Sequence, residues 1–85
     1  NNMNMFLIYI VIIVTSGVEV KLNTSIPAFY DLQSCKEYVM KNQKSLLDSA
    51  NSTFINKDVL EMGCVRMKNK DEIDFNPIYK MDKRV

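Results

Sequence analysis

The first 18 residues of this 85-residue chain carry no charged side chain, whereas all 21 charged residues lie at or after Glu19. Within this stretch, residues 5–14 are ten consecutive apolar residues. A transmembrane helix needs about 20 apolar residues to cross the hydrocarbon core of a bilayer. The most generous count here, residues 3–18, gives 16 residues. The run is therefore short for a membrane span, and two other structures compete for it.

The first competing structure is a signal peptide or membrane anchor at residues 3–17. A signal peptide combines a basic segment, an apolar stretch of about 7–15 residues and small residues at the cleavage site. The apolar length fits, and Thr15, Ser16 and Gly17 are small. No lysine or arginine precedes the apolar run, so the pattern is incomplete and we keep it as the alternative interpretation.

The second competing structure, which we favour, is a β-hairpin. Eight of the ten residues at 5–14 are β-branched or aromatic, and such side chains suit the pleated surface of a strand. Residues 15–17 form a plausible three-residue loop, and residues 18–23 then alternate between apolar and polar. We therefore predict strands at 5–14 and 18–26. Pairing Val14 with Val18 would place Val20 opposite Ile12 and Leu22 opposite Ile10.

A strand that is apolar on both faces is usually central in its sheet and covered on both sides. A chain of this length is expected to have one helix, which can cover only one face. The other face of the first strand would then need another cover. We predict that Leu7, Tyr9, Val11 and Ile13 bind a protein partner or a second copy of the chain, while a membrane is a further candidate for this apolar run.

The rest of the chain predicts a helix and one more strand. Pro27 ends the second strand because it lacks a backbone N–H, and Asp31 is a suitable N-cap for a helix at 31–49. A third strand is expected at 62–68, beside the first, and residues 69–85 read as a polar tail. The predicted fold is a single α+β domain at 1–68, with one helix packed on a three-stranded sheet of order 2-1-3.

The two cysteines of the chain indicate how the fold is stabilised and in which compartment the protein resides. Cys35 falls in the first turn of the predicted helix and Cys64 in the third strand, so the fold would bring them together. A disulfide there would stabilise the fold by about 3–4 kcal/mol on the chain-entropy model. Two buried free thiols are the alternative. A disulfide would favour a location outside the cytoplasm or in a virus particle.

The layout also resembles a family of small two-cysteine proteins of enterobacteria and their phages. The matching features are the strand at 18–22, the segment Phe29-Tyr30-Asp31-Leu32-Gln33-Ser34-Cys35 and the pair Cys64-Val65. The resemblance covers roughly residues 5–67. It implies a strand-hairpin, helix and strand domain with a disulfide, and it implies no activity.

Several functional classes are disfavoured by composition. The chain has no histidine, which removes the usual general base and a common metal ligand. A net charge of +1 does not suit a nucleic-acid-binding protein. Cys35 at a helix N-terminus could be a nucleophile, but it has no histidine to activate it. We therefore predict no enzyme activity, no catalytic residue, no metal site and no cofactor.

The functional expectation is a non-catalytic interaction or structural protein encoded by a phage. It would bind a partner, or itself, through an apolar sheet face or a strand edge. The alternative is an exported or membrane-anchored protein of the cell envelope, with residues 3–17 as signal or anchor. A thiol-based redox protein is a third hypothesis.

Overall fold

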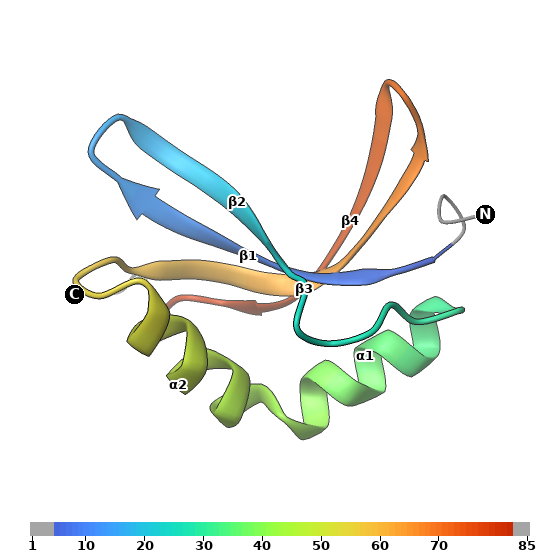
Figure 1. The fold of residues 1–85 in the computed structure, drawn as a ribbon, viewed down its shortest axis with the longest axis horizontal. Coiled ribbons are helices and arrows are strands. Elements are labelled where there is room, and N and C mark those ends of the chain that lie inside the picture. The colour runs from blue at the N-terminus through green and yellow to red at the C-terminus, as the bar shows by residue number, and fades with distance from the viewer. Residues whose placement is uncertain (1–4, 83–85) are drawn as a thin grey trace.

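The structure is a computed structural model that describes residues 5–82, and it contains a four-stranded antiparallel sheet with two helices. The strands are β1 (Leu7–Val14), β2 (Gly17–Asn23), β3 (Val59–Asn69) and β4 (Glu72–Lys80). The helices are α1 (Leu32–Lys41) and α2 (Gln43–Thr53). The strand order is β2-β1-β3-β4, with β2 and β4 at the two edges (Figure 1). The apolar strand β1 is therefore central, flanked by β2 and β3.

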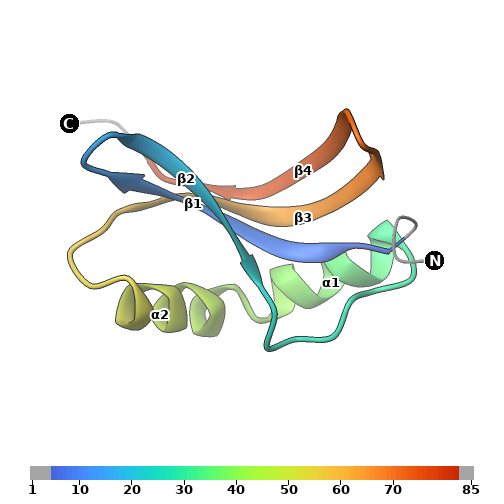
Figure 2. The same ribbon diagram turned by 45° about the horizontal axis from the view of Figure 1, so that its top comes forward.

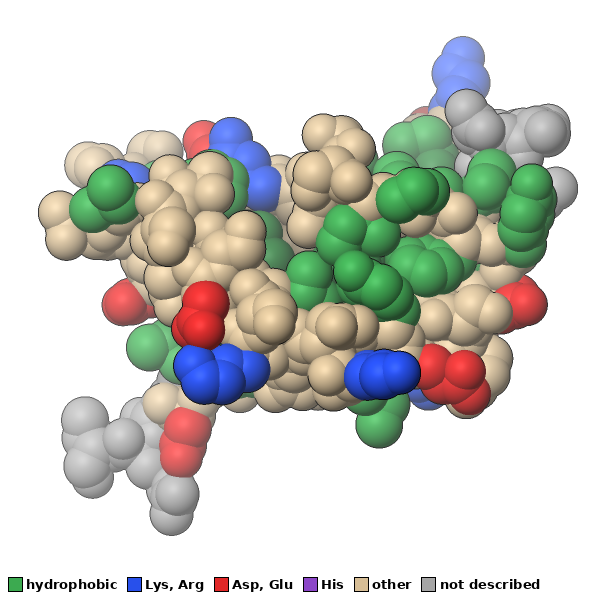
Figure 3. Space-filling model, turned by 60° about the horizontal axis from the view of Figure 1, so that its bottom comes forward, with side chains coloured by type: hydrophobic (Ala, Val, Ile, Leu, Met, Phe, Trp, Pro, Cys, Tyr) green, Lys and Arg blue, Asp and Glu red, His purple; other side chains and the backbone are tan. Residues whose placement is uncertain are grey.

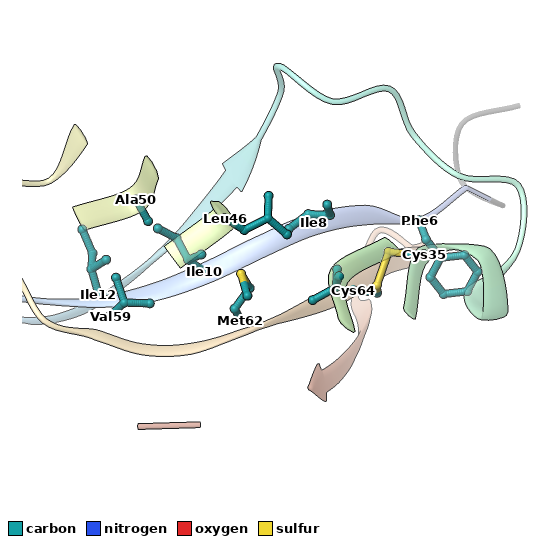
Figure 4. Packing of buried hydrophobic residues seen from close by; sticks show 11 residues of the cluster. Phe6, Ile8, Ile10, Ile12, Cys35, Leu46, Ala50, Val59, Met62 and Cys64 are labelled. Carbon is teal, nitrogen blue, oxygen red and sulfur yellow. A yellow bond between two sulfur atoms is a disulfide. The ribbon is translucent and has the colours of Figure 1, made fainter. Parts of the chain in front are cut away.

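Both helices lie on the same side of the sheet (Figure 2). The even-numbered residues of β1 face them, and Ile8, Ile10 and Ile12 form a core with Leu46 and Ala50 of α2 (Figure 4). Each of these isoleucines is at most 8% exposed. Full burial of such a side chain contributes about 1.5–3 kcal/mol relative to leaving it in water. On the opposite side of the sheet, the two hairpins diverge away from the helices (Figure 1).

The predicted fold class is wrong in its number of elements. The sheet has four strands rather than three, and two helices rather than one connect β2 to β3. The order 2-1-3 of the first three strands is present within the larger sheet. Residues 3 and 4 of the predicted signal, residues 1–4 of the predicted domain and residues 83–85 of the predicted tail lie outside the described residues.

The predicted helix at 31–49 is interrupted at Asn42. Asp31 is the N-cap, and its carboxylate accepts a hydrogen bond of 2.7 Å from the Ser34 N–H, which lowers the pKa of that carboxyl. The side-chain amide of Asn42 donates to the Tyr38 carbonyl at 2.9 Å. The Asn42 backbone N–H also donates to this carbonyl, at 3.0 Å, but the residue has a φ of −112° and a ψ of 22°, which are not helical. Asn42 therefore separates α1 from α2 at a bend, and the two helices follow the curved sheet (Figure 1).

The fourth strand falls within the region for which we predicted a polar tail. Residues 70 and 71 make a tight turn after β3, in which the Asn69 side chain accepts a hydrogen bond of 2.8 Å from the Asp71 N–H. The chain then returns along β3 as β4. Its residues alternate strictly from Glu72 to Asn76, but Pro77 argues against a strand unless the strand is at an edge. β4 is such an edge.

The hairpin of β1 and β2 has a different register from the predicted one. The loop contains two residues, Thr15 and Ser16, and Val14 pairs with Gly17 rather than with Val18. Gly17 has a φ of 141°, which an L side chain rarely adopts, so its presence permits the tight entry into β2. A slip of one residue moves every side chain of a strand to the opposite face. The three apolar residues of β2 consequently face away from the helices.

The predicted disulfide is confirmed. Cys35 of α1 and Cys64 of β3 are bonded, with their Cα atoms 6.3 Å apart, and both side chains are fully buried (Figure 4). The alternative of two free thiols is therefore wrong, since neither cysteine of the chain is free. The bond joins the helical layer to the second central strand of the sheet.

Candidate interaction surface

The side of the sheet that faces away from the helices is here named the open face. Residues paired across antiparallel strands share a face, so the strand registers define its members. They are Leu7, Tyr9, Val11 and Ile13 of β1, Val18, Val20 and Leu22 of β2, Glu61, Gly63, Val65 and Met67 of β3, and Ile73, Phe75, Pro77 and Lys80 of β4. Only Glu61 and Lys80 carry charge, and these two residues pair with each other in the register.

Exposed apolar side chains are concentrated on the open face. Ten large hydrophobic side chains are exposed among the described residues, and seven of them belong to this face. Those seven are Ile13, Val18, Val20, Leu22, Met67, Ile73 and Phe75. Single exposed hydrophobic residues are ordinary on protein surfaces, but a contiguous group on one sheet face marks an interaction surface.

The four residues predicted to bind a partner all lie on the open face, but they differ in exposure. Ile13 is 40% exposed, and Leu7 and Val11 are half-buried. Tyr9 is fully buried. A partner resting on this face would therefore touch Ile13 and the neighbouring strands more than the middle of β1.

Tyr9, at the centre of the open face, contacts side chains of two other strands. The rings of Tyr9 and Phe75 form a T-shaped pair with their centroids 5.0 Å apart, a favourable aromatic geometry. Its hydroxyl donates a hydrogen bond to the Glu61 carboxylate. Burial, together with this hydrogen bond and the charge of Glu61, raises the pKa of Tyr9 well above its ordinary value of 10.0. The β1, β3 and β4 strands are thereby linked on this face.

Stability is expected to decline at alkaline pH through Tyr9. The folded state holds the phenol proton more tightly than the unfolded state, so this contribution is complete below about pH 10 and is lost as the pH rises further. The free energy of unfolding should fall by at most about 1.4 kcal/mol per pH unit. Urea unfolding between pH 8 and pH 11 measures it. Tyr9→Phe should flatten this decline, whereas Tyr30→Phe, at an 86% exposed position, should not. Equal pH profiles for wild type and Tyr9→Phe would contradict the assignment.

A hollow lies between β2 and α2. It has a volume of about 220 Å³, with Ile8, Ile10 and Met62 among its lining residues. Polar residues of β2 and α2, including Lys21 and Ser49, complete the lining. It forms because β2 turns its polar residues toward the helices. It is smaller than the roughly 300–1,000 Å³ of typical small-molecule sites.

The helix side of the molecule has a mixed surface. Figure 3 shows hydrophobic side chains gathered near its middle, with acidic and basic side chains in neighbouring positions around them. Lys44 and Asp48 form one such exposed pair on α2, at 2.9 Å. Opposite charges set side by side do not make the basic stripe that nucleic acids attract.

Residues 5–82 contain neither a side-chain group suited to a metal ion nor a membrane-spanning helix. No three or more cysteine, aspartate or glutamate side chains in that range are placed to hold a metal ion. Both described helices are too short or too polar to span a bilayer.

Comparisons with protein-family models, with curated proteins and with solved structures found no match. The resemblance to small two-cysteine proteins of enterobacteria and phages stays a prediction.

Sequence reasoning missed most of the open face. A three-residue loop at 15–17 pairs Val20 with Ile12 and Leu22 with Ile10, and this register would put the apolar residues of β2 on the helix side. The whole of β4 falls within the predicted polar tail at 69–85. The signal available for β4 was the strict alternation from Glu72 to Asn76, followed by a proline that only an edge strand tolerates. No comparable local signal distinguishes a two-residue from a three-residue loop at Thr15-Ser16-Gly17.

Proposed function

We propose that the protein is a non-catalytic interaction protein and that the open face is its contact surface for another polypeptide. The observation that carries this proposal is the gathering of seven of the ten exposed large hydrophobic side chains on that one face. Interface cores are depleted in charged residues and enriched in aromatic residues and methionine. The open face has this composition, with Phe75 and Met67 among its exposed side chains.

The shape of the sheet supports the same proposal. The two hairpins diverge on the side of the sheet that faces away from the helices, where the open face lies (Figure 1). Tyr9, Phe75 and Glu61 fix the centre of this face through a ring contact and a hydrogen bond. A surface that is ordered before binding loses less conformational entropy when a partner docks. Glu61 and Lys80, the two charged residues of the open face, would orient that partner.

The proposal is tested with a random-peptide display library selected on the full chain. Selected peptides are expected to bind the open face and to lose at least about tenfold in affinity, or about 1.4 kcal/mol, on the double variant Val18→Ser, Ile73→Ser. Both positions are exposed, at 62% and 52%, so the fold should tolerate the changes. Fluorescence polarisation with the selected peptides gives the affinities.

A matched control is available on α1. Met40 is 62% exposed, like Val18, but belongs to the helical layer. Met40→Ser should leave peptide affinity unchanged. Peptides that bind the open-face double variant as tightly as wild type, or that lose affinity on Met40→Ser instead, would overturn the proposal.

The exported or envelope protein is kept as a second candidate because the Cys35–Cys64 disulfide favours an oxidising compartment. In this candidate, residues 3–17 are a signal or anchor. Cleavage after residue 17 would remove β1, which lies in the middle of the sheet. Intact-mass analysis of the protein from its source separates the two candidates, because a mature chain starting near Val18 would lack β1.

A further inference from the structure

The β2 edge of the sheet is unusually regular. Its seven residues pair with β1 in one continuous register, and all of them except Asn23 are exposed. The opposite edge differs, because β4 contains Pro77 and its pairing with β3 shifts register at two places. Proline and bulges are common devices that prevent an edge from pairing with another chain. β4 has both a proline and bulges, and β2 has neither; the charged side chains of β2, which can also protect an edge, are Glu19 and Lys21.

The unpaired backbone groups of β2 belong to its apolar residues. The Ile13 N–H donates to the Asp58 carbonyl at 3.0 Å, on the β3 side of β1. Ile13 therefore does not bond its β2 partner Val18, and hydrogen-bonded and non-bonded pairs alternate along an antiparallel ladder. The N–H and C=O groups of Val18, Val20 and Leu22 consequently point outward, toward the free edge.

The side chains of β2 are self-complementary. If two copies of β2 pair antiparallel about Val20, then Val20 faces Val20 of the second copy and Val18 faces Leu22 of the second copy. The same register sets Glu19 opposite Lys21 of the second copy, in both directions. Within one chain, Glu19 and Lys21 already lie 3.2 Å apart on the face toward the helices. The pairing would therefore join four charges of alternating sign.

We propose that a second copy of this chain docks on the β2 edge, in an antiparallel β2–β2 pair centred on Val20. Such a contact is a closed two-fold dimer in which the same patch meets itself. The dimer would have a continuous eight-stranded sheet, and the open faces of the two copies would join into one apolar surface. This inference rests on the proposed function and makes it more specific. It identifies the polypeptide that binds at β2, the edge strand of the open face, as a second copy of this chain.

The test measures the dimer dissociation constant of the full chain by sedimentation equilibrium. Wild type should form a dimer. Glu19→Lys sets a lysine opposite Lys21 of the second copy, and Lys21→Glu sets a glutamate opposite Glu19 of the second copy. Like charges directly opposite each other destabilise paired strands. Because a two-fold dimer contains each such pair twice, either single variant should raise the dissociation constant by at least about tenfold.

Two combinations restore the opposite charges. An equimolar mixture of the two single variants should form a heterodimer, and the double variant Glu19→Lys, Lys21→Glu should dimerise like wild type. The mixture is the sharper test, because each chain in it still lacks its internal Glu19–Lys21 ion pair. Lys44→Glu, which makes the same charge change on exposed α2, is the matched control and should not alter dimerisation. Circular dichroism verifies that each variant is folded.

Three results would overturn the inference. They are a wild type that stays monomeric throughout, a dimer that the single charge changes leave intact, and single variants whose mixture does not associate. A dimer weakened by Val18→Ser, Ile73→Ser but not by the charge changes would place the contact on the open face instead of the edge. A monomeric wild type that still binds the selected peptides through the open face would refute the dimer and leave the proposed function standing.

Discussion

Replacement of Gly63 with alanine is expected to destabilise the protein by about 3 kcal/mol or more, the upper part of the range for overpacked sites. Gly63 lies at the register shift between β3 and β4, opposite Tyr9 on one side and Pro77 on the other. A Cβ atom there would collide with the Asn76 carbonyl oxygen and would lie 2.8 Å from the Pro77 Cα. Both are backbone atoms, so the β3–β4 pair would have to separate. Urea unfolding followed by circular dichroism measures the loss.

Gly17 is the matched control for this prediction. A Cβ atom at Gly17 meets nothing within 4 Å, although its φ of 141° is unfavourable for alanine. Gly17→Ala should therefore cost only the backbone strain, about 1–2 kcal/mol. Gly63 does not have a positive φ, so its requirement is for space alone. A Gly63→Ala variant as stable as wild type, or more stable than Gly17→Ala, would show that the two strands do not approach this closely.

Loss of the Cys35–Cys64 disulfide is expected to lower the free energy of unfolding by about 3–4 kcal/mol. The bond closes a loop with a sequence separation of 29 residues, and opening it increases the conformational freedom of the unfolded chain. Domains have only about 5–15 kcal/mol of stability in total, and a domain this small buries a modest core. The urea midpoint should therefore fall sharply when reductant is added.

The double variant Cys35→Ser, Cys64→Ser completes this experiment. It should unfold at a low urea concentration, and its midpoint should not respond to reductant. Alkylation of the unreduced, denatured wild type should modify neither cysteine. Equal midpoints for oxidised and reduced wild type would mean that the bond contributes nothing to stability. Ready alkylation without reductant would mean that the bond is not formed.

The location of the open face could be predicted only in part. Leu7, Tyr9, Val11 and Ile13 were recognised because β1 is apolar at both odd and even positions, and one helical layer can cover only one face. Their exposure could not be predicted. Tyr9 is buried by contacts with Phe75 and Glu61, which come from two strands far along the chain.

The amino-acid sequence by itself determined the local features of this protein. An unbroken β-branched run made β1 a strand with no polar face, Asp31 capped the first helix, and the placement of the two cysteines allowed the disulfide. The strand and the helix cap depend on side-chain chemistry and on residues near one another in the chain, and such preferences act before any tertiary contact forms. The disulfide also needs the fold, which brings Cys35 of α1 to Cys64 of β3 across a separation of 29 residues.

Only the tertiary structure decided which surface is apolar. One residue of loop length at Thr15 and Ser16 sets the register of β2, and that register turns Val18, Val20 and Leu22 away from the helices. β4 becomes a strand because β3 offers it an edge on which Pro77 is tolerated. Register and edge position are properties of paired strands. An alternating pattern shows that the apolar residues of a strand share one face, but only the pairing with a neighbouring strand decides which face of the sheet that is.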